Sequence, residues 1–165
     1  MFSGVEQTGQ SFVTFRLGRE DYALPITKVE SIIRYEVSTP VPRAPAAVAG
    51  VINLRGRIIP VIDLSRRLRD VVFEPGPQAR IIIADGEAGS VGLAVDAASE
   101  VIRVAEESIL EPPENMLSAG IMEMIIGVLE VNDKLVILLD LDHAVPHTEY
   151  AGMASTIDLE GESDV

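Results

Sequence analysis

The chain contains one short pattern twice. Residues 50–64 (GVINLRGRIIPVIDL) recur in outline 77 positions later as residues 127–141 (GVLEVNDKLVILLDL). Each copy has two runs of Val, Ile and Leu around polar turn residues and ends in Asp-Leu, which predicts strand, tight turn and strand. The copies differ at the turn, where the first has Arg55-Gly56 and the second has Asn132-Asp133. We interpret the shared pattern as scaffold and the difference as function.

A second pair of segments supports an internal duplication. Residues 22–34 (YALPITKVESIIR) align without gaps, at an offset of 69, with residues 91–103 (VGLAVDAASEVIR). The repeat unit is thus about 70 to 80 residues, which is too long for a solenoid period. We therefore predict two copies of a small domain, packed together, with halves at about 11–70 and 71–142.

Periodicity predicts a hairpin followed by a short helix in each copy. Residues 11–17 and 22–26 read as strands around a turn. In the first copy Thr27 precedes Glu30 by three residues, a candidate capping box at the start of a helix. Its apolar face would contain Ile26, Val29, Ile32 and Ile33. In the second copy the aligned cap is Asp96, with Ala98, Val101 and Ile102 on the face.

A proline-rich linker leads to the repeated hairpin. Residues 38–47 (STPVPRAPAA) contain three prolines, so we expect an extended, helix-free crossing. Strands expected at 49–54 and 57–64 include Pro60, which a strand tolerates only at an edge or a bulge. Short bent strands favour small barrels over a flat sheet. We expect flexible tails at 1–10 and at 151–165, where four acidic residues have no basic counterpart.

Composition limits the class of protein. The 165 residues are 47% hydrophobic, which predicts a folded globular chain with a core. The absence of Cys excludes disulfides, thiol nucleophiles and thiolate metal sites. Residues 1–10 lack the basic flank and apolar core of a signal peptide, and no apolar run approaches a membrane span. We expect a soluble, cytoplasmic protein with no direct membrane insertion.

The net charge of −13 is distributed unevenly. Residues 1–70 contain ten Lys and Arg against seven Asp and Glu, or +3, whereas residues 71–165 contain three against nineteen, or −16. One dense basic cluster could meet an acidic protein surface or form a solvated face. It consists of Arg55, Arg57, Arg66, Arg67 and Arg69. Nucleic acid is not an expected partner, because an acidic chain with 4% aromatic residues lacks the field and the stacking platforms for it.

At residues 50–68 the chain resembles a known family. The run GVINLRGRIIPVIDL followed by SRRL looks like the signature of the CheW family, the adaptor proteins of bacterial chemosensory arrays. Two further blocks agree with the family pattern, FVTFRLGREDYALPITKVESII and VGLAVDAASEVI. The likeness spans about residues 11 to 142.

The resemblance implies a mainly β fold with two pseudo-symmetric, interlocked five-stranded SH3-like barrels, short helices and a shared core, in a single domain of residues 11–150. It implies no catalysis and no cofactor. The implied partners are the cytoplasmic tip of a chemoreceptor and the regulatory domain of a CheA-like histidine kinase, which has the same fold. Such a protein is expected to be a monomer alone and multimeric in membrane-associated receptor arrays.

The resemblance assigns receptor binding to Arg55, Gly50, Val29 and Val101. The residues themselves favour Arg55, because a turn projects its side chain and Gly56 can take a positive φ. A guanidinium suits the carbonyls and carboxylates of a helical partner. Core packing is the alternative role for the two valines. Ser31 departs from the family pattern, which has an acidic residue there, so a salt bridge from that position is in doubt.

For the kinase we expect an apolar barrel edge that meets a similar edge of the kinase domain. The candidates are Ile58, Ile59, Val61, Val37 and Val41, with core packing as the alternative role for most of them.

Two further functions compete with this adaptor. One is a CheW-like adaptor of a pilus-motility or other non-flagellar chemosensory pathway. The other is a small hydrolase with a site at Asp140, Asp142 and His143. His143 and His147 have the spacing of helical metal ligands, but Pro146 disfavours a helix between them, so we predict no metal site. Asp63 and Asp140, aligned in the two copies, are expected to accept backbone N–H groups at helix starts.

Overall fold

Strands dominate the chain in the computed structural model, which describes residues 9–112, 122–153 and 155–156. The predicted mainly β class is confirmed. The strands are β1 Gln10–Leu17, β2 Glu20–Pro25, β3 Val29–Arg34, β4 Val48–Leu54, β5 Arg57–Asp63, β6 Arg80–Gly86, β7 Gly89–Val95, β8 Ala97–Val104, β9 Ile125–Val131, β10 Lys134–Leu139 and β11 Ser155–Thr156. The short helices are η1 Ile26–Lys28, α2 Leu64–Arg69, η2 Glu106–Ser108, η4 Met122–Met124, α3 Leu141–Ala144 and η5 His147–Glu149.

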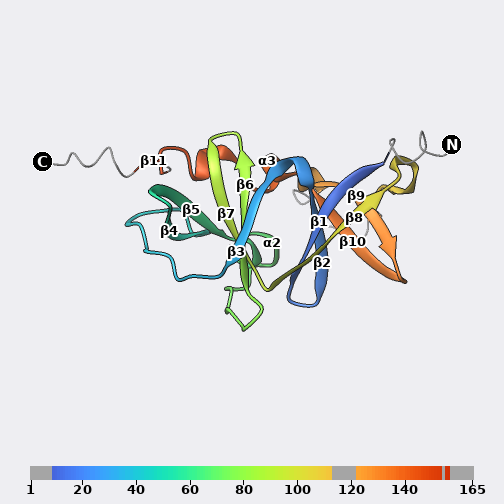
Figure 1. Ribbon diagram of the computed structural model, residues 1–165, viewed down its shortest axis with the longest axis horizontal. Coiled ribbons are helices and arrows are strands. Elements are labelled where there is room, and N and C mark those ends of the chain that lie inside the picture. The colour runs from blue at the N-terminus through green and yellow to red at the C-terminus, as the bar shows by residue number, and fades with distance from the viewer. Residues whose placement is uncertain (1–8, 113–121, 154, 157–165) are drawn as a thin grey trace, which may run out of the picture.

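The strands form two sheets that lie side by side along the longest axis (Figure 1). One sheet has the order β8-β1-β2-β10-β9, and the other has β11-β5-β7-β6-β3 with β4 paired to β5. The strand pairings among the described residues do not close either sheet into a ring. The structure therefore contains two β units, as expected. The expected pair of five-stranded barrels is corrected, because one unit has six strands and both are open sheets.

Each sheet contains strands from both halves of the sequence. In the repeat alignment β5 corresponds to β10 and β2 corresponds to β7. The structure pairs β5 with β7 and β10 with β2, both in parallel. The same exchange pairs β1 with β8 and β6 with β3. Every one of these ladders joins the first half to the second.

The two predicted helices after the hairpins are wrong. Only Ile26–Lys28 is helical, as a 3-10 turn without a side-chain cap, and Val29–Arg34 is strand β3 against β6. The aligned segment Ala97–Val104 is strand β8 against β1. Their Val and Ile residues are stiff at χ1 and fit a pleated strand better than a helix. Pairing with a distant strand then satisfies the backbone groups.

The main hydrophobic core contains side chains from both halves. Phe15, Leu17 and Tyr22 of the first half pack with Leu93 and Leu141 of the second in one cluster. The rings of Phe15 and Tyr22 stack with centroids 5.8 Å apart. Two smaller clusters lie around Phe12 and Leu138 and around Ile59 and Ile81. The predicted shared core is present.

The linker lies across the start of β4. Thr39 and Val51 form an antiparallel bridge with two N–H···O bonds of 2.8 Å. This close approach requires Gly50, whose φ is 155°, because a Cβ there would lie 2.3 Å from the Thr39 carbonyl oxygen. The linker is free of regular helix, as predicted. It is not extended throughout, because it contains two turns, closed by hydrogen bonds from the Ala44 N–H to the Val41 carbonyl over 3.2 Å and from the Val48 N–H to the Pro45 carbonyl over 2.9 Å.

Pro60 and the C-terminal segment meet around β5. On one side β5 pairs with β4 throughout, whereas on the other it pairs with β11 at Arg57 and Ile58 and with β7 from Val61 onward. Pro60 falls in the gap between these last two ladders, which explains how the strand tolerates it. Strand β11 also corrects the expectation of a flexible tail at two of its residues, 155–156. Residues 157–165 lie outside the described part.

Candidate functional site

The β4–β5 turn has a strained residue at its tip. Leu54 pairs with Arg57, so only two residues connect the strands, and both have positive φ, 54° at Arg55 and 83° at Gly56. This is the type I′ geometry that suits the twist of a hairpin. The Gly56 N–H donates to Asn53 Oδ1 over 3.0 Å and fixes the loop. The predicted tight turn is confirmed.

The second copy of the turn has the same backbone but different chemistry. Asn132 and Asp133 have φ values of 52° and 66°, and both residue types tolerate the left-handed region. Arg55 does not tolerate it as readily, because the left-handed conformation costs an ordinary residue about 1 to 2 kcal/mol. Such strain persists mainly where function requires it. The two turns thus share a left-handed backbone, and the first has an arginine where the second has an asparagine.

Most of the predicted basic cluster is neutralised within the molecule. Arg67 donates to the Ala144 carbonyl over 2.7 Å and pairs with Glu149 at 2.6 Å. Arg69 lies 3.9 Å from Glu20. Arg55, by contrast, is exposed, and its side chain has no hydrogen bond or ion pair within the described residues. The expected single basic face is therefore reduced to separate cations, of which Arg55 projects from a hairpin.

Arg57, at the base of the same hairpin, is held by two other strands. Its Nη2 donates to Ser90 Oγ on β7, and its Nη1 lies 3.7 Å from Glu30 Oε1 on β3. Ser90 Oγ in turn donates to Glu30 Oε2 over 2.8 Å. We call Glu30, Ser90 and Arg57 the hairpin-base network. It links the Arg55 hairpin to β3, the strand that contains Val29.

The other three predicted receptor residues do not form one patch with Arg55. Gly50 is buried, and its close approach to Thr39 gives it a structural role. Val29 is partly buried against the main core. Val101 is 57% exposed on β8, in the other sheet from the β4–β5 hairpin (Figure 1). Receptor contact by these residues remains a prediction.

The predicted kinase residues divide between core and surface. Ile59 and Val61 are 0% and 1% exposed and pack in a cluster with Ile81, which leaves them no side-chain surface for a partner and assigns them to the core. Ile58 and Val41 are partly exposed. Val37, in the chain after β3, is 82% exposed.

The two histidines interact with different carboxylates. His143 Nδ1 lies 3.0 Å from Asp140 Oδ2, and His147 Nδ1 lies 3.1 Å from Glu87 Oε1. The hydrogen bond and the charge of Asp140 raise the pKa of His143 above its ordinary value. Within the described ranges, no three His, Asp or Glu side chains are grouped to hold a metal ion. In the same ranges no helix is long and apolar enough to cross a membrane.

The aligned aspartates follow the capping prediction in one copy only. Asp63 accepts hydrogen bonds from the N–H groups of Arg66 and Phe73, each over 3.0 Å, at the start of α2. Asp140, at the start of α3, makes no capping bond from its side chain and pairs with His143 instead. The prediction is confirmed for Asp63 and wrong for Asp140.

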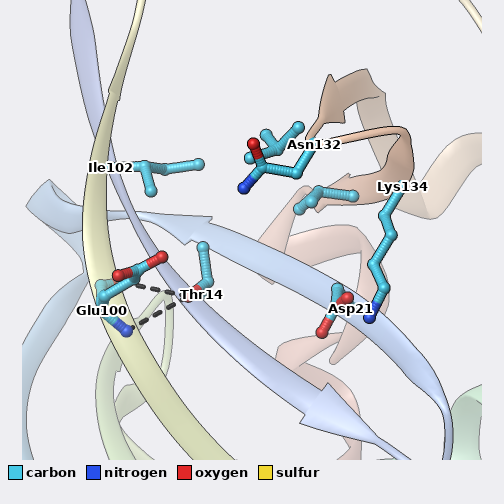
Figure 2. Close-up of a pocket in the computed structure, with 8 residues that line it drawn as sticks. Thr14, Asp21, Glu100, Ile102, Asn132 and Lys134 are labelled. Carbon is cyan, nitrogen blue, oxygen red and sulfur yellow. Dashed lines mark hydrogen bonds between the residues drawn. The ribbon is translucent and has the colours of Figure 1, made fainter.

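A polar hollow lies beside the second-copy turn (Figure 2). Its volume is about 160 Å³, and Lys134 and Asp21 point toward one another at its edge. Thr14 Oγ1 donates to the Glu100 carbonyl over 3.1 Å and accepts from its N–H over 3.2 Å. Ligand pockets usually span about 300 to 1,000 Å³, so this hollow is too small for such a ligand.

Comparison with known proteins agrees with this geometry. The family model described as "CheW-like domain" matches residues 11–149. The chain belongs to the CheW family. "Chemotaxis protein CheW" from Rhizobium meliloti is 36% identical over 86% of this chain and 90% of its own length, and the protein of that name from Treponema pallidum is 34% identical over 87% and 86%. The crystal structure of the scaffolding protein TtCheW from Thermoanaerobacter tengcongensis has a TM-score of 0.77 and 32% identity to this CheW-family chain, covering 89% of it and 94% of TtCheW.

Sequence reasoning missed three residues of the site. Asn53 could have been found, because an Asn placed before a turn often bonds a backbone N–H within it. Ser90 and Glu30 carry no local signal, since they are 33 and 27 positions from Arg57 in the sequence. Only the exchange of strands between the halves brings them together.

Proposed function

We propose that this chain is a non-enzymatic chemotaxis adaptor that couples the cytoplasmic tip of a chemoreceptor to a CheA-like histidine kinase. Membership of the CheW family supports the adaptor function. The observation that carries the receptor assignment is the Arg55 turn. There a guanidinium without a partner among the described residues lies at the tip of a hairpin despite its backbone strain. Its planar fork of donors matches the carbonyls and carboxylates at the surface of a helical receptor tip.

The proposed kinase surface consists of Val37, Val41 and Ile58, of which Ile58 lies on the β4–β5 hairpin itself. Val37 is an exposed apolar side chain, and Ile58 and Val41 are partly exposed. An apolar surface of this kind would meet an apolar edge of the kinase regulatory domain. An adaptor needs both surfaces at once, and we place the protein in the cytoplasm, as a monomer when free and as part of a receptor array when bound.

Co-elution with the two partners tests this proposal. The chain is mixed with a CheA-like kinase from its own organism, with and without receptor-tip fragments, and then fractionated by size. We expect complexes with each partner and a ternary complex with both. Failure to bind either partner would reject the adaptor function.

A charge reversal tests the assignment of the two surfaces. Arg55→Glu should weaken receptor binding and leave kinase binding intact, and an exposed charge contributes about 1 kcal/mol or less. Arg66→Glu is the matched control, because Arg66 is also exposed, and within the described residues its side chain has no partner. An equal loss of kinase affinity in Arg55→Glu would assign the turn to the kinase.

A further inference from the structure

The two arginines of the β4–β5 hairpin differ in their side-chain contacts. Arg55 and Arg57 are two residues apart, carry the same charge and are both exposed. The Arg57 guanidinium is bound to Ser90 and faces Glu30, whereas the side chain of Arg55 has no such partner in the described part of the chain. The hairpin therefore offers one free cation and one compensated cation.

Ser90 makes the compensation specific. Its hydroxyl is buried, with the residue 6% exposed, and it accepts from Arg57 while it donates to Glu30. A hydroxyl can do both at once. Ser90 thereby fixes the positions of the guanidinium and the carboxylate relative to each other. Without it, the 3.7 Å approach of Arg57 to Glu30 would be an ordinary surface pair with little energy and little order.

This arrangement fixes the position of the Glu30 carboxylate and compensates its charge. Glu30 Oε1 lies 3.7 Å from the guanidinium of Arg57, two residues along the chain from Arg55. The field of a charge extends over about 8 to 10 Å in physiological salt. If Arg57 did not compensate it, the charge of Glu30 would reduce the positive field at the tip of the hairpin. The same network therefore holds the Glu30 carboxylate against Arg57 and Ser90 and leaves the Arg55 guanidinium without a partner in the described part of the chain.

We propose that the hairpin-base network of Glu30, Ser90 and Arg57 is a positioning device that keeps Glu30 occupied and Arg55 available to the receptor. This inference rests on the proposed function of the Arg55 turn. Arg57 and Ser90 act through Arg55 and do not touch the partner themselves. Receptor affinity then depends on Arg57 only as long as Glu30 carries its charge.

A double-variant experiment on the full chain tests this device. Arg57→Gln should weaken binding of a receptor-tip fragment about two- to fivefold, the range of an exposed charge interaction. Arg57→Gln combined with Glu30→Gln should restore most of that affinity, although it carries two substitutions. Arg66→Gln, which removes the same charge from α2, should leave the affinity unchanged.

Rescue separates the positioning role from other roles of Arg57. If Arg57 contacted the receptor, or only stabilised the fold, neutralising Glu30 would not restore binding, and the proposal would be wrong. Ser90→Ala should weaken binding in the same direction, and Ser90→Thr, which keeps the hydroxyl, should bind like the original chain. Loss in both Ser90 variants would also overturn it.

A measurement without receptor keeps the network and the proposed function apart. In the free protein, NMR should show slowed rotation of the Arg57 guanidinium, with separate Nη signals, that is lost in Ser90→Ala and in Glu30→Gln. A freely rotating Arg57 in the original chain would refute the network itself. A restrained Arg57 combined with no receptor binding by any form would instead refute the proposed function.

Discussion

Exchanging the turn residues between the two copies should separate stability from binding. Arg55→Asn gives the first turn the residue that the second turn has at the same φ, 54° against 52°. Asn tolerates this conformation and the following Gly56 completes the most favourable type I′ pair. Relief of the left-handed strain, about 1 to 2 kcal/mol for an ordinary residue, should therefore raise the free energy of unfolding by about 1 kcal/mol.

The gain is large enough to measure. For a chain of this length about 1 kcal/mol raises Tm by roughly 2 to 4 °C. With an m-value of about 2 kcal/mol/M, the urea midpoint should rise by about 0.5 M. The same variant should bind receptor-tip fragments more weakly, because the guanidinium is gone.

The reciprocal substitution is the control. Asn132→Arg places an arginine at φ 52° in the second turn and should lower the free energy of unfolding by a similar amount without changing receptor binding. Urea titrations of the two variants measure the expected rise and the expected fall in the free energy of unfolding. If Arg55→Asn is no more stable than the original chain while Asn132→Arg is destabilised, Arg55 is not strained in its own turn, and the structural reason for assigning function to Arg55 fails.

Two further perturbations test the fold around this hairpin. Gly50→Ala should destabilise the chain by about 3 kcal/mol, at the upper end of overpacking costs, because its Cβ would meet the Thr39 carbonyl oxygen at 2.3 Å. Urea titration measures this loss. The control is Gly76→Ala, which has open space around it and should show no such loss. Burial, followed by the charge of Glu20, raises the pKa of Tyr22 to about 12, so the unfolded chain ionises this phenol first and stability should fall as the pH rises from 10 through 12. Tyr22→Phe should show a smaller fall in urea midpoint between pH 9 and pH 11, and an unchanged fall would contradict the assignment.

The sequence was sufficient to predict the elements that local chemistry determines. Two-residue turns between Val- and Ile-rich runs predicted both hairpins of the repeat, and the position of Asp63 before α2 predicted its cap. Family resemblance added the receptor assignment of Arg55. The left-handed φ of that residue is visible only in three dimensions.

The wrong predictions concern segments whose structure is decided by distant partners. In residues 26–33 the apolar spacing suits one face of a helix, but β6 lies alongside and the segment pairs as β3. In the same way, residues 97–104 pair with β1 and form strand β8 instead of the expected helix. The two aligned aspartates show a smaller effect of the same kind, since His143 draws Asp140 away from the backbone.

The same dependence on distant partners explains why the sequence could not distinguish the role of Arg57 from that of Arg55. Arg55 and Arg57 look equivalent in the run NLRGR. They differ only because β7 and β3 bring Ser90 and Glu30 to one of them.

The exchange of strands also governs when the protein can fold during its synthesis. Gln10 of β1 pairs with Val104 of β8, so 94 further residues must be made before this ladder can close. At about 5 to 20 residues per second, that interval is roughly 5 to 20 s. During this interval the apolar first half stays attached to the ribosome with unpaired strand edges, which are templates for aggregation. A nascent chain of this design should therefore be a client of ribosome-associated chaperones until the second half has been translated.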